Sequence, residues 1–354
     1  MARVVLYAEV ACFYASVERA AAPELATRPV IVGGDPRKRG LVQAATPDAL
    51  AAGVHAEMAM LEALQLCPSA RAIRTNMPRY REASRRLIAC LRRELEKLEA
   101  AGLGAVYADA SGAPNGPDSI AQSWVARVKE ELGLSLRVGI ARTKLLARLA
   151  AEEAGEGVRR VAPREEEAFL RPLPVTRLEG VGQKTASTLA ELGAHTIGAV
   201  AALGRERLEA LFGVHGLRIH ASATGVDDPP VRAARHPQSL SREATLAGEP
   251  FDREALLEHL QQLSRQLEDE LRVQGLSSRR VTLKIRYAEQ GTTTRSQAVS
   301  TPLASAAEIH AVAQHLLGRA QASLHPIRGL GIQLAKLVPQ RESDRQLDLF
   351  SPRR

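Results

Sequence analysis

The stretch Val4-Val5-Leu6-Tyr7-Ala8-Glu9-Val10 leads, three residues on, into Phe13-Tyr14-Ala15-Ser16-Val17-Glu18, and this pair of segments decides the fold of the N-terminal part. The first segment is nearly continuous in apolar residues, which is typical of a strand covered on both faces. The second predicts the start of a helix. A buried strand followed at once by a helix indicates a layered α and β arrangement.

The same alternation continues outward from this stretch to about residue 165. Further strands are predicted at Pro29–Val32, Gly104–Ala110 and Leu136–Ile140, and helices at Glu57–Leu66, Tyr80–Glu99 and Ser119–Leu132. The turn Gly33-Gly34-Asp35-Pro36 ends the second strand by its composition. The alternation therefore predicts an α/β or α+β unit, and the 354 residues leave room for two to four compact units.

Composition and charge limit the partners of the chain. The net charge is +8 and the pI about 9.7, which favours an anionic partner such as nucleic acid. The three cysteines form no CxxC pair, so neither a disulfide framework nor a zinc knuckle is predicted. The nine histidines show no HxH or HxxxH spacing, so no histidine metal site is predicted. No apolar run approaches a membrane span of roughly 20 residues. We expect a cytoplasmic protein with no membrane partner.

Several motifs of the first unit stand in the order found in one known family. They are Phe13–Glu18, Arg28–Arg37, Leu61–Pro68, Arg79–Glu82 and Val138–Ala141. They resemble the palm and fingers of Y-family (DinB/UmuC-like) DNA polymerases, the low-fidelity enzymes that copy past damaged bases. The resemblance implies an α+β right hand: a palm over residues 1–165 with fingers inserted at about 18–75, a helical thumb at 166–235, a little finger at 236–340 and a tail at 341–354.

A polymerase palm needs carboxylates that hold two Mg²⁺ ions between the attacking and leaving oxygens. The resemblance implies one Asp near the end of the first strand and an Asp-Glu pair on a later strand. In this chain the position of the first Asp is occupied by Glu9. The position two residues further on, where the family commonly has another acid, is occupied by Ala11. The pair is replaced by Gly104 and Ala105, whose side chains cannot ligate a metal.

No other acid replaces the missing pair in the predicted sheet. Asp109 shares the face of Ala105, but four residues along a strand span roughly 13 Å at about 3.3 Å each. Glu9 alone is a poor Mg²⁺ site, because Mg²⁺ demands near-octahedral oxygen ligands. We therefore expect Glu9 to be solvated or paired with a nearby arginine. We also expect no metal and no catalytic residue, with Mg²⁺ as cofactor only if the chain is an active polymerase.

The positions that would contact the incoming nucleotide also lack the residues found in the family. The resemblance implies a Tyr and an Arg that hold the incoming triphosphate, and the matching positions are Pro47 and Leu50. Leucine cannot reproduce the bidentate contacts of arginine with phosphate. A lysine that meets phosphate after Val138–Ile140 is matched by Gly155. Tyr14, which matches the residue that blocks ribonucleotides, is retained, and we attribute it to packing.

The thumb contains a segment, Leu173 to Lys184, that resembles a helix-hairpin-helix. Gly180 and Gly182 flank Val181 in the predicted turn, so the backbone can approach a phosphate. The N-terminus of the next helix would present free N–H groups to that phosphate, and Lys184 adds charge. Contacts of this kind position DNA without reading its sequence.

The C-terminal third has the pattern β-α-β-β-α-β, a split βαβ arrangement. Strands are predicted at Ser241–Leu246, Arg280–Tyr287, Thr292–Ser300 and Arg328–Leu337, and helices at Asp252–Val273 and Ser305–Ser323. The second strand turns its apolar residues to one face and Arg280, Lys284 and Arg286 to the other. The little fingers of Y-family polymerases lie against duplex DNA in this way, so we expect this basic face to contact DNA, with an affinity that falls steeply with salt.

The chain ends in a polar segment, residues 341–345, that we expect to be disordered. Gln346-Leu347-Asp348-Leu349-Phe350 follows and resembles the pentapeptide by which bacterial polymerases bind the sliding clamp. Leu349 and Phe350 would fill an apolar pocket of the clamp, and Gln346 would hydrogen-bond at its edge.

These features lead to three hypotheses. The main hypothesis is a non-catalytic Y-family homologue, similar to the inactive (ImuB-like) subunit of the bacterial mutasome. It would bind primer-template DNA and the clamp as an adaptor in damage-induced (SOS) mutagenesis, with an error-prone replicative-type polymerase and a RecA-like accessory protein as implied partners. The second hypothesis is an active translesion polymerase with a rebuilt metal site. The third is a DNA-binding clamp accessory without a polymerase partner.

Overall fold

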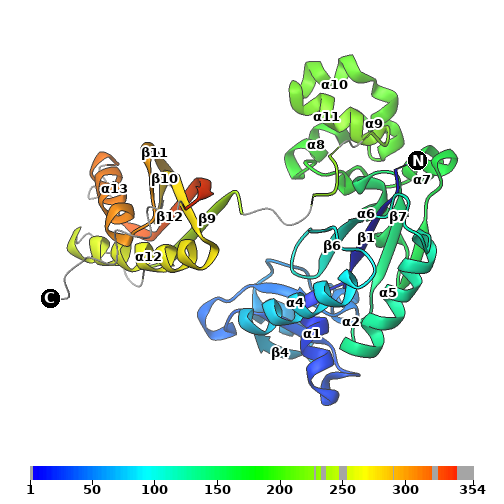
Figure 1. Ribbon diagram of the computed structural model, residues 1–354, viewed down its shortest axis with the longest axis horizontal. Coiled ribbons are helices and arrows are strands. Elements are labelled where there is room, and N and C mark those ends of the chain that lie inside the picture. The colour runs from blue at the N-terminus through cyan, green and yellow to red at the C-terminus, as the bar shows by residue number, and fades with distance from the viewer. Residues whose placement is uncertain are drawn as a thin grey trace. The chain divides into compact units, whose positions relative to one another are not determined.

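We describe the protein from a computed structural model that covers residues 3–226, 229–232, 237–246, 253–289, 291–320 and 326–340. The chain divides into two compact units, Met1–Ala234 and Arg235–Arg354 (Figure 1). No helix within the described ranges is long and apolar enough to cross a bilayer.

The first unit is built on a five-stranded sheet with the order β5-β6-β1-β7-β8. Its strands are β1 (Val5–Glu9), β5 (Leu98–Ala100), β6 (Ala105–Asp109), β7 (Arg137–Ala141) and β8 (Gly157–Arg160). The central strand β1 is antiparallel to both β6 and β7. Its apolar residues are buried on both faces, which is why the segment carries no polar alternation.

Helices cover both faces of this sheet. On one face Leu6 and Ala8 pack in a core with α1 (Phe13–Ala21), α4 (Met77–Arg92) and α5 (Pro117–Leu132). On the other face Val5 and Tyr7 share a core with α6 (Lys144–Glu153). The end of β1 and the start of α1 are joined by Cys12, which has a left-handed backbone with φ of 52°.

A second, smaller sheet with the order β3-β2-β4 has its own core around Ile31 and Met60. It comprises β2 (Val30–Gly33), β3 (Val42–Ala45) and β4 (Arg71–Arg74), with the short helices α2 (Pro47–Ala51) and α3 (Met60–Leu66) and the 3₁₀ turns Pro23–Leu25 and Pro36–Lys38. These elements fall within the stretch that the sequence resemblance implies to be the fingers.

Five helices follow β8 after the 3₁₀ turn Pro163–Glu165. They are α7 (Glu166–Leu170), α8 (Gln183–Glu191), α9 (Ile197–Leu203), α10 (Arg205–Phe212) and α11 (Val214–Ala223), with a 3₁₀ turn at Val175–Arg177. Their buried side chains, such as Leu189 and Leu208, belong to the same core as Tyr7 of β1. This helical part therefore packs on the α6 face of the large sheet.

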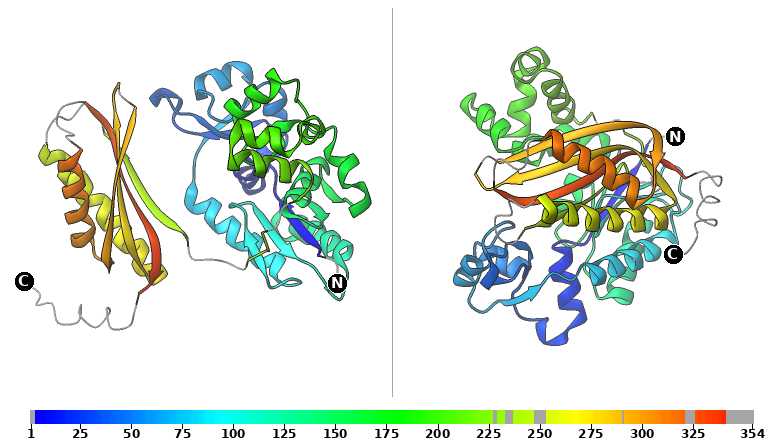
Figure 2. Two further views of the ribbon diagram at one scale, coloured as in Figure 1. Left: turned by 90° about the horizontal axis from the view of Figure 1, so that it is seen from above. Right: turned by 90° about the vertical axis from the view of Figure 1, so that its left-hand side faces the viewer.

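The second unit has the order of elements that the sequence predicts. It contains β9 (Ser239–Thr245), α12 (Arg253–Gln274), β10 (Leu276–Tyr287), β11 (Thr292–Leu303), α13 (Ala306–Arg319) and β12 (Ile327–Pro339). The antiparallel sheet has the order β11-β10-β12-β9, and both helices lie on one of its faces (Figure 2). Val281, Leu283 and Ile285 form the core with these helices, so the other face of β10 is free of them.

Besides small shifts at the ends of strands β9, β10 and β11, three local predictions differ from the structure. The helix expected over Tyr80–Glu99 ends at Arg92, and Leu98 belongs to β5, where it pairs with Ala108 and is buried. The helix expected at 57–66 begins at Met60. The first helix of the expected helix-hairpin-helix is only the 3₁₀ turn Val175–Arg177, because the backbone is already extended at Leu178 (φ −73°, ψ 134°) and the chain turns again at Gly180.

Candidate palm active site and nucleic-acid interface

Glu9 is the last residue of β1, and its neighbours across the sheet are Ala105 of β6 and Arg137 of β7. The Arg137 Nε and Nη2 atoms both donate to Oε2 of Glu9, at 3.0 and 2.6 Å. The side chains of Arg137 and Glu9 are 22% and 26% exposed. The carboxylate is therefore held by an arginine, which was one of the two outcomes expected for Glu9.

Gly104 and Ala105 contribute no ligand beside Glu9. A Cβ atom at Gly104 would lie 2.6 Å from the Phe13 ring and 2.7 Å from the Phe13 Cβ, so the aromatic side chain takes the space that an acid would need. Ala105 lies opposite Glu9 but ends at its methyl group. Asp109 lies opposite Val5, at the far end of β1 from Glu9, and its Oδ1 accepts from the Ser111 N–H at 2.9 Å.

The surroundings of the Glu9–Arg137 pair are half-buried and contain two weak acids. Burial raises the pKa of the Tyr7 hydroxyl, and the charge of Glu9 acts in the same direction. Burial also raises the pKa of the Cys12 thiol, against the lowering influence of Arg137. Both groups are therefore neutral at pH 7 and cannot replace a carboxylate. Within the described ranges, no group of three His, Cys, Asp or Glu residues could hold a metal ion.

The positions matched to the triphosphate contacts lie at α2. Pro47 begins this helix, and Leu50 exposes 43% of its surface. Between them Asp48 forms an ion pair with Arg19 of α1 at 2.9 Å. Gly155 has φ of 66° and open space around it. None of the three matched positions, Pro47 and Leu50 in α2 and Gly155 after α6, has a cationic side chain that could pair with a phosphate.

Tyr14 lies in an aromatic and charged cluster. Its ring stacks on Tyr80 with centroids 4.4 Å apart and planes 13° apart. The Tyr80 hydroxyl donates to Glu18 at 2.9 Å, and Arg79 donates to the other oxygen of this buried carboxylate at 2.5 Å. Burial, together with this hydrogen bond, raises the pKa of Tyr80. The cluster fixes Tyr14 by packing between α1 and α4.

The turn at Gly180 is shaped for a close approach. Gly180 has φ of 84°, which favours glycine, and its carbonyl oxygen lies 3.1 Å from Nε2 of His215. Gly182 is exposed with open space around it, and α8 begins at the next residue. Lys184 in the first turn of α8 is exposed. These residues offer backbone N–H groups and one charge at the protein surface.

The basic face of the second unit contains an acid that the sequence reasoning missed. Glu243 of β9 accepts from Lys284 at 2.9 Å and from Arg286 at 3.1 Å. Strand β12 lies between β9 and β10, and both cations cross it where it carries Gly329 and Gly331. A Cβ at Gly331 would lie 2.7 Å from Cγ of Glu243, so a larger residue there would displace the Glu243 side chain from its present position.

The three predicted cations of β10 are therefore not equivalent. The hydrogen bond from Lys284 holds the pKa of Glu243 below its usual range, against a smaller opposing influence of burial, so the carboxylate is charged at neutral pH. Arg280 lies apart from this pair and faces Ala335 and Ala298 across the sheet. Its Nε is buried and has no hydrogen-bond partner among the described residues. Alternate residues of β9 lie on opposite faces of the sheet, and this pattern was the sequence signal that could have placed Glu243 on the basic face.

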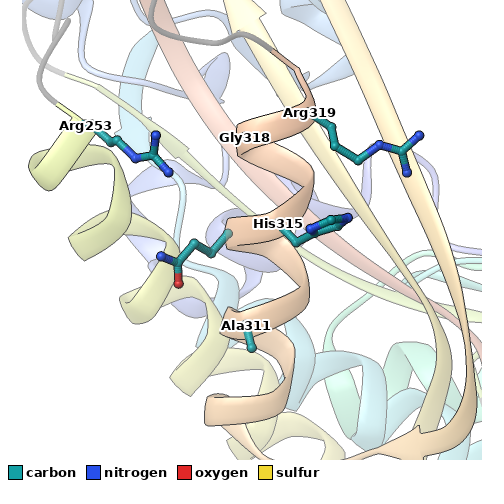
Figure 3. A pocket seen from close by; sticks show the side chains of 6 residues that line it. Arg253, Ala311, His315, Gly318 and Arg319 are labelled. Carbon is teal, nitrogen blue, oxygen red and sulfur yellow. The ribbon is translucent and has the colours of Figure 1, made fainter.

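A depression on the helical side of the second unit provides no convergent group of side chains. It is lined by Arg253, Ala311, Gln314, His315, Gly318 and Arg319. Figure 3 shows His315 and Arg319 extending from one side of α13, while Arg253 lies on α12 at the other side. The side chains of Arg253, His315 and Arg319 do not converge on one point, so the depression is no candidate for a catalytic site.

Comparison with known proteins gives this geometry its context. The profile of the impB/mucB/samB family matches residues 9–152, and that of the family's C-terminal domain matches residues 237–349. DNA polymerase IV of Halorhodospira halophila is 34% identical over 353 residues, which are 99% of this chain and 98% of that protein. The chain belongs to the impB/mucB/samB family of Y-family DNA polymerases. DNA polymerase IV 1 of Bacillus subtilis is 33% identical over 99% of this chain and 86% of its own length.

Solved structures of this family share the fold. A Y-family DNA polymerase chimera of Dbh and Dpo4 superposes with a TM-score of 0.84 at 23% identity, over 95% of this chain and 100% of that chain. An insertion ternary complex of Dbh DNA polymerase superposes with a TM-score of 0.72 at 22% identity, over 95% of this chain and 100% of that chain. The predicted Y-family fold is confirmed.

The expectation that the chain is not an enzyme is contradicted by its relatives. Proteins named DNA polymerase IV match it along almost its whole length, and the matches give no support for a pseudoenzyme. The expectation was drawn from a few side chains in the palm and at α2, whereas the similarity extends over both units of the chain. A missing side chain at a matched position shows how that position differs, and it does not show what the whole protein does.

The Mg²⁺ that this family implies does not fit Glu9, Gly104 and Ala105. Mg²⁺ requires several oxygen ligands in near-octahedral geometry. Here one carboxylate oxygen is bound by a guanidinium, and the two neighbouring positions have no oxygen in their side chains. Glu9, Gly104 and Ala105 therefore do not form a magnesium site.

Proposed function

We propose that this protein is a translesion DNA polymerase that binds primer-template DNA without regard to sequence, and that its catalytic ligands are not the Glu9, Gly104 and Ala105 set. The observation that carries the proposal is the similarity to proteins named DNA polymerase IV over 99% of the chain. The same class was the second of the three hypotheses drawn from the sequence.

The residues that would hold DNA are those of the second unit and of the Gly180 turn. Lys284 and Arg286 lie on the sheet face that α12 and α13 leave uncovered, where a phosphate could replace Glu243 as their partner. Gly182 and the first turn of α8 would bring backbone N–H groups to a second phosphate, with Lys184 beside it, whereas the Val181 N–H already donates to the Leu178 carbonyl at 3.2 Å. Contacts of both kinds are to the backbone of DNA, so the proposal includes no sequence preference.

Primer extension tests the catalytic part of this proposal. We expect the natural chain to add one nucleotide to a primed template in the presence of Mg²⁺ or Mn²⁺. We also expect Glu9→Gln to leave the rate within about twofold, because a carboxylate already held by Arg137 supplies no metal ligand. The measurement is single-nucleotide incorporation on a template whose binding is followed by fluorescence anisotropy.

The two readouts separate the parts of the proposal. A chain that binds the template and adds no nucleotide would remove the polymerase part and leave the DNA-binding part. Loss of nucleotide incorporation in Glu9→Gln, with DNA binding unchanged, would show that Glu9 is a metal ligand. Pro47→Ala is the matched control, since this exposed residue begins α2 and carries no charge in either form.

We propose the bacterial sliding clamp as the protein partner, through Gln346-Leu347-Asp348-Leu349-Phe350. These residues lie outside the described part of the chain, and the proposal rests on their resemblance to the clamp-binding pentapeptide. The proposal requires neither an error-prone replicative-type polymerase nor a RecA-like accessory protein.

Truncation before Gln346 should abolish clamp binding and leave the affinity for primer-template DNA unchanged. The reason is that the deleted residues include the two apolar side chains expected to fill the clamp pocket, while Lys184, Lys284 and Arg286 all remain. Surface plasmon resonance on immobilised clamp gives the affinity, and Leu349→Ala/Phe350→Ala serves as a variant of full length. Unchanged clamp affinity in both variants would refute the assignment of this segment.

A further inference from the structure

Glu9 is bound by a cation that belongs to the chain itself. Arg137 approaches it from the neighbouring strand with two N–H groups, and both donate to the same oxygen, Oε2. Both N–H groups carry the delocalised charge of the guanidinium, so the contact is charge-assisted and stronger than a hydrogen bond between neutral groups. We propose that the guanidinium of Arg137 is the permanent cation of Glu9, and that the palm binds no divalent metal at this position.

The charges around the pair support this assignment. The charges of Glu9 and Arg137 sum to zero. The two positions at which the family has further acids are occupied by the uncharged Gly104 and Ala105. The neutral Tyr7 and Cys12 lie nearby, and the other charges that act on them belong to Arg148, which is paired with Glu152, and to Arg19, which is paired with Asp48. A divalent ion at Glu9 would therefore meet a carboxylate that the Arg137 guanidinium already binds, with no second carboxylate at Gly104 or Ala105.

The packing supports it independently. Val10 N–H donates to the Gly104 carbonyl at 2.9 Å, which holds the start of β6 against the end of β1. Phe13 fills the space beside Gly104, so the strand ends cannot open for a further ligand unless the aromatic ring moves. The site is built as a closed ion pair. Its charge does not depend on the concentration of Mg²⁺, and the inference stands whether or not the proposed polymerase activity is found.

Mn²⁺ binding tests the inference without DNA or catalysis. The amplitude of the electron paramagnetic resonance signal reports free hexaaquo Mn²⁺ in a titration of the natural chain, of Glu9→Gln, and of Ala105→Glu/Arg137→Gln. We expect the first two to deplete the signal equally. The third has a second carboxylate opposite Glu9 and lacks the guanidinium, so we expect it to bind Mn²⁺ at least tenfold more tightly, and to lose that gain when Glu9→Gln is added.

The natural chain and Glu9→Gln decide the question even if the third variant does not fold. Mn²⁺ binding by the natural chain that Glu9→Gln removes would overturn the inference, because it would show that metal reaches this carboxylate. Failure of a folded Ala105→Glu/Arg137→Gln variant to gain Mn²⁺ would also overturn it, since Arg137 would then not be what keeps metal away.

Thermal melting in EDTA gives a second measurement. Glu9→Gln and Arg137→Gln each leave one partner unpaired, and we expect each to lower the melting temperature by roughly 3–8 °C. The double variant should melt above both single variants, because neither charge then remains alone. Strictly additive shifts would contradict the inference. A rise in melting temperature on adding Mg²⁺ to the natural chain, absent in Glu9→Gln, would contradict it as well.

Discussion

Replacing Glu243 by glutamine is expected to tighten binding to duplex DNA on the order of tenfold at about 0.1 M salt. In the natural protein this carboxylate neutralises Lys284 and Arg286 across β12, at 2.9 and 3.1 Å. A phosphate must displace it before the two cations can act on DNA. Glutamine has nearly the same shape and no charge, so both cations would become available to the backbone.

The salt dependence gives the sharper readout of the same change. Each phosphate contact adds about 0.9 to the slope of log affinity against log salt, so two released cations should steepen it by about 1.8. Fluorescence anisotropy between about 0.05 and 0.2 M salt would measure it. Asp269→Asn is the matched control, because it removes one negative charge from α12, a helix packed on the opposite face of the sheet. Equal slopes together with equal affinities in the natural chain and Glu243→Gln would show that Lys284 and Arg286 do not contact phosphate.

The second unit shows what a strand pattern can and cannot predict. The period of two along β10 correctly separates Val281, Leu283 and Ile285 from the cations on the other face, because alternate side chains of a strand point to opposite faces. Glu243 lies on a strand that does not pair with β10. Its approach depends on the sheet order and on Gly331, neither of which is visible within a single strand.

The palm shows the same limit at the level of chemistry. The sequence places Glu9 at the end of a buried strand and shows that its expected partners are Gly104 and Ala105. The partner it has, Arg137, is 128 residues away and reaches it through the pairing of β1 with β7. An arginine partner was one of the two outcomes expected for Glu9, and the pairing that selects Arg137 comes from the sheet. The inference from missing carboxylates to a protein that is not an enzyme went beyond the residues that supported it.

Gly139→Ala is expected to destabilise the first unit by about 3 kcal/mol or more. Gly139 lies in β7, two residues from Arg137, and a Cβ there would stand 1.9 Å from the Ala147 carbonyl oxygen and 2.5 Å from the Ala151 nitrogen. Both atoms belong to the backbone of α6, so no side-chain rotation can make room. The helix would have to move away from the sheet, opening the core that it shares with Val5 and Tyr7.

Urea unfolding measures this effect as a fall in the midpoint at unchanged slope, because stability and not the surface exposed on unfolding should change. Gly182→Ala is the matched control: it adds the same methyl group in the same unit, but nothing lies within 4 Å of it and its φ of −81° suits any residue. We expect the control to stay within about 1 kcal/mol of the natural chain. A Gly139→Ala variant equally stable would mean that α6 does not pack closely on β7. The strand that carries Arg137 to Glu9 would then lack the rigid support that a permanent ion pair needs.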